Sequence, residues 1–234
     1  MEIVTTADGW MFLMRWIHFL AGITWIGILY YFNFVQTPFF GTELGGTARG
    51  AMVRGLMPSA LWWFRWGAMI TFLTGWIIII GRMHQGVSLG DGYMTRILTG
   101  GILGTFMWAN VWFVIWPAQK VVIASAEQVA KGGTAIAEAA AFGARAGLAS
   151  RTNTLFSIPM LFFMGAASHM GWLHNGNNDA IYWIVALVIM LAFEFNMLVG
   201  TGQARQKFLS TVSGTIHMGL ALAIVLYVIG AVLN

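Results

Sequence analysis

The sequence contains no cysteine, only 8 Asp and Glu residues and only 4 Pro in 234 residues. Without cysteine the chain forms no disulfides, thiolate metal sites or iron–sulfur sites, and it cannot attach a c-type haem, which needs a Cys-x-x-Cys-His sequence. Charged residues make up 9% of the chain, whereas soluble proteins carry about 25%. Because so few charges cannot cover a water-facing surface, the composition excludes an ordinary soluble domain.

Hydrophobic residues, in contrast, make up 59% of the chain, and aromatic residues make up 15%. A stretch of about 20 apolar residues is long enough to cross a lipid bilayer as a helix. The sequence therefore predicts an all-α integral membrane protein, with residues 1–234 forming a single six-helix transmembrane bundle. The predicted spans are about 10–35, 59–81, 96–117, 153–172, 180–200 and 208–232.

The basic residues are distributed unequally between the two sides of this bundle. The connections after the first, third and fifth spans hold eight of them, namely Arg49, Arg54, Lys120, Lys131, Arg145, Arg151, Arg205 and Lys207, whereas the other connections hold Arg82 and Arg96. Cytoplasmic loops carry an excess of Lys and Arg. We therefore expect both termini on the non-cytoplasmic side of a membrane, most simply the bacterial inner membrane.

The distribution of the basic residues also indicates which partners the chain binds. The formal net charge is +4, but the basic residues are scattered along the connections and form no compact patch. We therefore expect the lipid bilayer, and no nucleic acid, to be the partner of these charges. The longest connection, about 118–152, is Ala-rich, and we expect it to form short helices on the cytoplasmic surface.

Five ionisable residues lie inside predicted spans, where burial in hydrocarbon costs several kcal/mol and makes each a candidate for function. With a rise of about 1.5 Å per residue, Glu194, Arg65 and Asn110 fall at nearly one depth in the inner half of the membrane, with His217 about one turn away. We expect Glu194 and His217 to face each other and exchange protons with a small polar substrate, with Arg65 and Asn110 beside them as further catalytic candidates. The alternative is a buried ion pair that fixes helix packing.

The outer half of the predicted bundle contains the remaining candidates for binding a cofactor. Neutral imidazole is a common ligand of haem iron, Zn and Cu. We expect a b-type haem at His18, where Gly22 leaves space for a flat ring, with His169 and Arg15 as further cofactor-binding candidates. His18 and His84 are candidate metal ligands. The alternative for His169 and His174 is a loop position at the membrane interface.

Several runs of residues resemble one known family. They are residues 16–18, 20–27, 30–36, 108–112, 115–120, 151–153 and 157–163. In these runs the chain is similar to the N-terminal membrane module of the bacterial membrane-bound, cytochrome-c-coupled urate oxidases, also called urate hydroxylases. The resemblance covers most of the chain.

The resemblance implies a redox function. Members of this family oxidise urate to 5-hydroxyisourate with water as the oxygen source, and pass the electrons to a c-type cytochrome domain outside the cytoplasm. This sequence has no cysteine to attach that haem, so we expect a separate cytochrome c or another redox protein on the non-cytoplasmic side. The alternative is a non-catalytic membrane subunit that packs against other subunits of a larger respiratory or electron-transfer complex.

Overall fold

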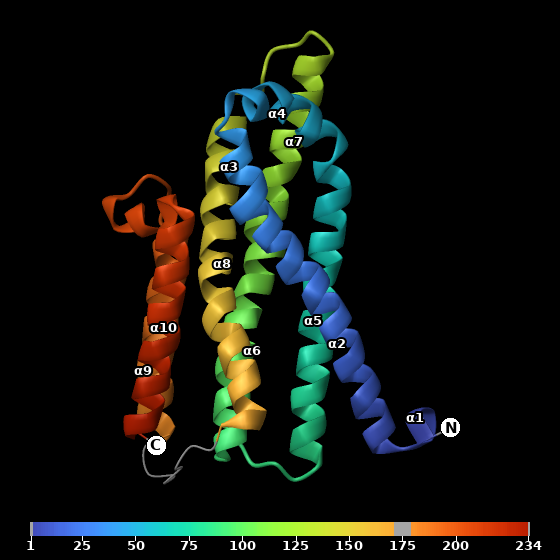
Figure 1. Ribbon diagram of the computed structural model, residues 1–234, viewed down its shortest axis with the longest axis vertical. Coiled ribbons are helices and arrows are strands. Elements are labelled where there is room, and N and C mark those ends of the chain that lie inside the picture. Colours follow the sequence, from blue (N-terminus) through green and yellow to red (C-terminus); the bar gives the residue numbers. More distant parts are fainter. Residues whose placement is uncertain (1, 171–178, 234) are drawn as a thin grey trace.

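The computed structural model describes residues 2–170 and 179–233, and these residues form helices and no strand (Figure 1). The all-helical prediction is therefore confirmed. The elements are α1 (Glu2–Thr5), α2 (Ala7–Tyr30), η1 (Tyr31–Gln36), α3 (Thr37–Phe40), α4 (Glu43–Gly55), α5 (Met57–His84), α6 (Gly92–Ala109), η2 (Asn110–Ile115), α7 (Trp116–Ala130), α8 (Ala139–His169), α9 (Asp179–Leu198), η3 (Ala204–Ser210) and α10 (Val212–Leu233).

Two long helical rods, one formed by α2, η1 and α3 and the other by α6, η2 and α7, each contain a π-helical turn just before a proline. In the first rod, η1 precedes Pro38, and in the second, η2 precedes Pro117. A proline lacks an N–H and its ring clashes with the carbonyl four residues earlier. The wider π turn accommodates this ring, so the helix continues where an α-helix would end. Pro117 therefore does not end the third predicted span.

The rods pack side by side as an elongated bundle (Figure 1). Helix α2 crosses α5 obliquely, α6 packs on α8, and the α9–α10 hairpin lies along the other side of α8. Both chain ends lie toward one end of the bundle, whereas α4 and the turn between α7 and α8 lie at the opposite end. The two ends of the described chain therefore lie at the same end of the bundle.

Five helical segments of the described chain are long and apolar enough to cross a membrane: Ala7–Phe40, Met57–His84, Gly92–Ala130, Ala180–Leu198 and Val212–Leu233. The fourth predicted span, about 153–172, falls largely in α8, which has 31 residues but does not reach the same apolarity. Polar residues lower the apolarity of this helix, and their side chains are buried inside the bundle. Thr152, Asn153, Thr154 and Ser157 are each 0–1% exposed. Protein, and not lipid, surrounds this face of α8.

The predicted surface loop at 118–152 has a different structure. Residues 118–130 belong to α7, which continues the rod of α6, and residues 139–152 begin α8. The connection itself is short and contains Gly132 in a left-handed conformation, with φ of +83°, which glycine adopts without steric cost. The expected short surface helices are therefore extensions of two long helices.

Small residues permit the closest helix contacts. A Cβ at Gly100 of α6 would lie 3.1 Å from the Met160 carbonyl oxygen of α8. A Cβ at Gly219 of α10 would lie 2.8 Å from the Leu155 carbonyl oxygen. That carbonyl has lost its helical donor because Pro159 lies four residues later. Gly219 therefore lets α10 approach α8 at the proline.

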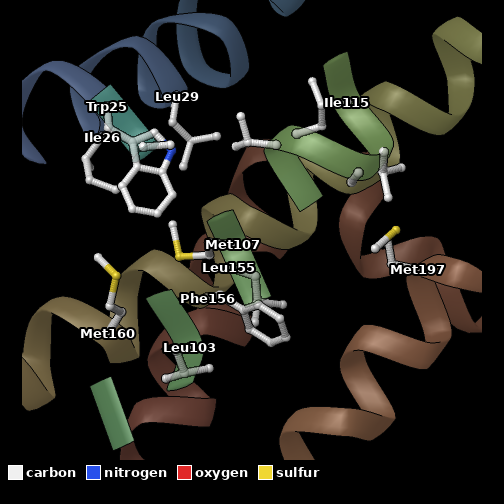
Figure 2. Packing of buried hydrophobic residues seen from close by; sticks show 14 of the residues in the cluster. Trp25, Ile26, Leu29, Leu103, Met107, Ile115, Leu155, Phe156, Met160 and Met197 are labelled. Atoms are coloured by element: carbon white, nitrogen blue, oxygen red, sulfur yellow. The ribbon is translucent and has the colours of Figure 1, made fainter. Parts of the chain in front are cut away.

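The apolar core lies between α2, α5, α6 and α8 (Figure 2). Trp25, Leu29, Leu103, Met107 and Leu155 are all 0–1% exposed and form part of one cluster. Within a bilayer, lipid is as apolar as these side chains, so close packing and hydrogen bonds hold the helices together. The polar groups enclosed by this core therefore form well-defined contacts.

Candidate functional site

A buried hydrogen-bonded network links three helical segments in the middle of the bundle. The Asn110 side-chain nitrogen donates to Asn153 Oδ1 at 3.0 Å and to Glu194 Oε2 at 3.1 Å. Asn153 in turn donates to the Met107 carbonyl oxygen at 2.9 Å. Asn110, Asn153 and Glu194 are 1%, 0% and 9% exposed. The structure thus brings together two of the four predicted catalytic residues, Asn110 and Glu194.

The other two, Arg65 and His217, lie elsewhere. The Arg65 guanidinium lies 3.5 Å from the centroid of the Trp116 ring and 5.6 Å from that of Trp112, so aromatic faces surround this cation. His217 is exposed, and its Nδ1 lies 2.7 Å from the carbonyl oxygen of Ser213 on its own helix. The predicted pairing of Glu194 with His217 was therefore wrong, because the helix orientation turns the imidazole outward.

The predicted cofactor residues of the outer half are dispersed. His18 packs between α2 and α5, with Nδ1 3.1 Å from Thr74 Oγ1, and a Cβ at Gly75 would lie 3.1 Å from its Cε1. His84 and His169 are exposed near the ends of α5 and α8, and Arg15 is half-buried on α2. His174 lies outside the described residues. Within the described residues, no group of three or more His, Cys, Asp or Glu side chains is placed to bind a metal.

These surroundings do not fit a haem. An axial ligand needs a ring nitrogen that faces space for the macrocycle. One edge of the His18 ring packs against Gly75, and His18 lines neither the large pocket at the end of the bundle nor the smaller pocket between α4 and α7. The function that we propose below therefore contains no step that depends on a haem. Haem binding stays a prediction for the absorption spectrum of the purified protein.

A large pocket opens at the end of the bundle opposite the chain termini. Its volume is about 850 Å³, within the range of small-molecule sites. The walls come from η1, α3, α4, α5, α7, α8 and the segment 201–210 that includes η3. The pocket thus joins all three connections in which the sequence concentrates its basic residues.

The charges of this pocket are all positive. Arg49, Arg151 and Lys207 line it, and no Asp or Glu is among the described residues that do so. Arg151 is half-buried and donates to the Leu209 carbonyl oxygen at 2.9 Å. Burial lowers the pKa of the Arg151 guanidinium, but arginine remains protonated in proteins. The pocket therefore attracts an anion.

Amides and aromatic rings complete the lining. The buried side-chain oxygens of Gln36 and Gln119 have no hydrogen-bond partner, and both residues line the pocket. Phe32 and Phe64 form an edge-to-face pair with ring centroids 5.8 Å apart on another part of the wall. Cations, unpaired carbonyl oxygens and apolar rings together suit a small, flat anion that carries N–H groups.

Helix α8 connects the pocket with the buried network. Ser150 lines the pocket and accepts a hydrogen bond from the Asn33 side chain at 2.7 Å. Asn153 lies one turn further along the same helix face, and Ser157 follows it, 2.9 Å from the Tyr30 hydroxyl. These residues form a polar row inside the bundle. The Glu194 network therefore lies directly beyond one wall of the pocket.

Sequence reasoning missed the pocket. Arg49, Arg151 and Lys207 were counted as topology signals, and the two glutamines carried no signal because a lone Gln has many structural roles. One clue was available, because Gln36, Gln119 and Arg151 all lie in runs that carry the family resemblance. No periodicity could place three connections around one cavity, because this placement depends on tertiary structure.

The fold and site define a class: an all-helical protein with five candidate membrane spans and a cationic pocket at one end. Residues 91–228 match the family described as urate oxidase N-terminal. Because this match covers more than half of the sequence, the chain belongs to that family, which confirms the resemblance of its motifs. No match was found among curated proteins or among solved structures.

Proposed function

We propose that this chain is the substrate-binding membrane module of a urate-oxidising system, and that urate binds in the pocket at the end of the bundle. One observation carries the proposal: Arg49, Arg151 and Lys207 line the pocket and no described carboxylate balances these cations, while Gln36 and Gln119, whose side-chain oxygens are unpaired, line it as well. Urate is a flat anion at neutral pH and carries several N–H groups. The description of the family supports this choice of ligand.

The proposed reaction converts urate and water to 5-hydroxyisourate, two protons and two electrons. The pocket would hold the anion through its cations and enclose the ring between apolar walls. Glu194 is our candidate for receiving a proton, because it is a buried carboxylate in contact with Asn110 and lies beyond the Ser150 wall. Asn110 would position this carboxylate.

The electrons need an acceptor outside this chain. We propose a separate cytochrome c or another redox protein on the non-cytoplasmic side, as the family resemblance implies. We further propose that α8 is the sixth span, that the basic end faces the cytoplasm, and that the membrane is the bacterial inner membrane. The excess of basic residues near the pocket supports this orientation. Urate would then bind from the cytoplasm.

The test is urate binding to the purified chain in nanodiscs, measured by equilibrium dialysis with radiolabelled urate. Arg151→Gln should weaken binding about tenfold or more, because a hydrogen bond to a charged group contributes about 1.5–3 kcal/mol. Arg145→Gln is the matched control, since it removes an exposed arginine of the same helix that does not line the pocket. Arg49→Gln with Arg54→Gln forms a second matched pair on α4.

Equal effects of the pocket and control variants would contradict the proposed site. Absence of saturable urate binding in the unaltered protein would contradict the function and favour the second candidate, a non-catalytic subunit of a larger complex. Oxidation is tested separately with urate, the chain and a soluble cytochrome c as electron acceptor. Reduction of the cytochrome that depends on both urate and this chain is the expected result.

A further inference from the structure

Two glutamines beside the prolines of the two rods share an unusual feature. Gln36 ends η1, two residues before Pro38, and Gln119 lies in α7, two residues after Pro117. Each therefore borders the point where a proline and a π turn reshape a helix. Both line the pocket, although they lie 83 positions apart in the sequence.

Their side-chain oxygens are buried without a hydrogen-bond partner. For Gln36 the remaining side-chain contact is weak, because its nitrogen donates to the Met57 sulfur at 3.1 Å, and thioether sulfur is a poor acceptor. The Gln36 side chain is 6% exposed. Leaving a buried acceptor unpaired is costly, and most buried polar groups in proteins are paired. Both residues line the cavity although protein atoms cover their oxygens, so a ligand would supply the missing donors once each terminal amide rotates toward the cavity.

We infer that Gln36 and Gln119 determine specificity by each accepting a hydrogen bond from a ring N–H of the bound ligand. This inference rests on the proposed function, because it takes urate as the ligand. The cations hold the anionic oxygens, whereas the glutamines detect whether specific ring nitrogens carry hydrogen. The ligand class is thus a planar heterocyclic anion with at least two unsubstituted N–H groups.

The four monomethyl urates test the inference, because each replaces one of the four ring N–H groups of uric acid by N–CH₃ and leaves the other ring nitrogens unmethylated. We expect the unaltered protein to bind at least two of them about tenfold or more weakly than urate, since an unpaired buried acceptor strongly rejects a ligand that lacks the donor. Gln36→Met should abolish the discrimination against one of these derivatives. Gln119→Met should abolish the discrimination against another.

Methionine keeps the length of glutamine but removes its acceptor. Gln128→Met is the matched control, because Gln128 is exposed on α7 and does not line the pocket. It should leave the preference among the four derivatives unchanged. Without ligand, Gln36→Met and Gln119→Met should be at least as stable as the unaltered protein, because the substitution removes an unpaired acceptor. A structural role would instead lower the stability of these two variants.

The outcomes separate this inference from the proposed function. If urate binds and the arginine variants behave as expected, but Gln36→Met and Gln119→Met retain the full discrimination, the inference is overturned and the function stands. Equal binding of urate and all four derivatives by the unaltered protein has the same meaning. If urate does not bind, the function and the inference both fail. Loss of stability in either methionine variant also overturns the inference.

Discussion

Replacing Asn110 with leucine tests the buried network of Asn110, Asn153 and Glu194. Leucine keeps a similar size but donates no hydrogen bond. The substitution leaves two acceptors without their donor: Asn153 Oδ1 and Glu194 Oε2, which are 3.0 and 3.1 Å from the lost nitrogen. Both residues are at most 9% exposed, so water cannot easily replace the donor.

The magnitude follows from these two bonds. Side-chain hydrogen bonds between membrane helices average about 0.6 kcal/mol, with a maximum of about 1.7, whereas leaving a buried acceptor unpaired costs about 1–3 kcal/mol. Two average bonds would give about 1.2 kcal/mol, and burial of a carboxylate raises this value. We therefore expect Asn110→Leu to lower the free energy of unfolding by about 2–4 kcal/mol.

The assay is reversible unfolding by SDS in mixed micelles, monitored by far-UV circular dichroism. Asn196→Leu is the matched control, because the Asn196 side chain accepts from Arg205 at a surface contact, and such contacts contribute about 0–1 kcal/mol. A double variant with Asn110→Leu and Glu194→Leu should recover part of the loss, since both partners are then apolar. If Asn110→Leu destabilises no more than Asn196→Leu, the network does not stabilise the bundle.

Three further predictions concern other parts of the chain. Gly219→Val should destabilise the bundle by about 1–3 kcal/mol, because its side chain would meet the Leu155 carbonyl. The control Gly165→Val, at a position where an added Cβ meets no atom within 4 Å, should be neutral in the same unfolding assay. Equal effects of the two variants would contradict the close contact. Glu194→Gln should lower urate turnover more than it lowers the yield of folded protein. Turnover is measured per amount of monodisperse protein, and the yield is the amount of that protein. A parallel loss of both would indicate a structural role. A phosphatase reporter fused at the C-terminus should be active and one inserted at residues 131–138 inactive; the reverse pattern would invert the topology.

The depth of a residue in the bundle could be predicted from the sequence, but its direction could not. Counting along the spans placed Asn110 and Glu194 at one level, and the structure joins them at 3.1 Å. The same count placed Arg65 there, but this side chain turns toward Trp116. The π turn η2 adds one residue to the helical turn directly before Trp116 and rotates every later side chain of that rod. Sequence periodicity of 3.6 residues contains no signal for that rotation.

Helix α8 shows a second limit of prediction from composition. The apolar stretch at about 153–172 predicted a span there, yet α8 is more polar than the five candidate spans because other helices surround it. Ser150, Asn153 and Ser157 each contact a polar group of a neighbouring helix. A hydropathy count treats such residues as evidence against a span. In a bundle, they instead mark the helix that lies at the centre.

The basic residues of the pocket have two physical roles that a sequence count cannot separate. Arg49, Arg151 and Lys207 belong to the excess of positive charge that sets membrane orientation, and they also line the pocket. Burial separates the roles for Arg151 alone, because Arg151 is half-buried whereas Arg49, Lys207 and the neighbouring Arg145 are exposed. A charge that only sets topology needs no burial, since it acts through the surrounding water and lipid headgroups. A cation withdrawn from water into a pocket without a described carboxylate has an electrostatic cost that a bound anion offsets. The partial burial of Arg151 is therefore a stronger argument for an anionic ligand than the number of basic residues.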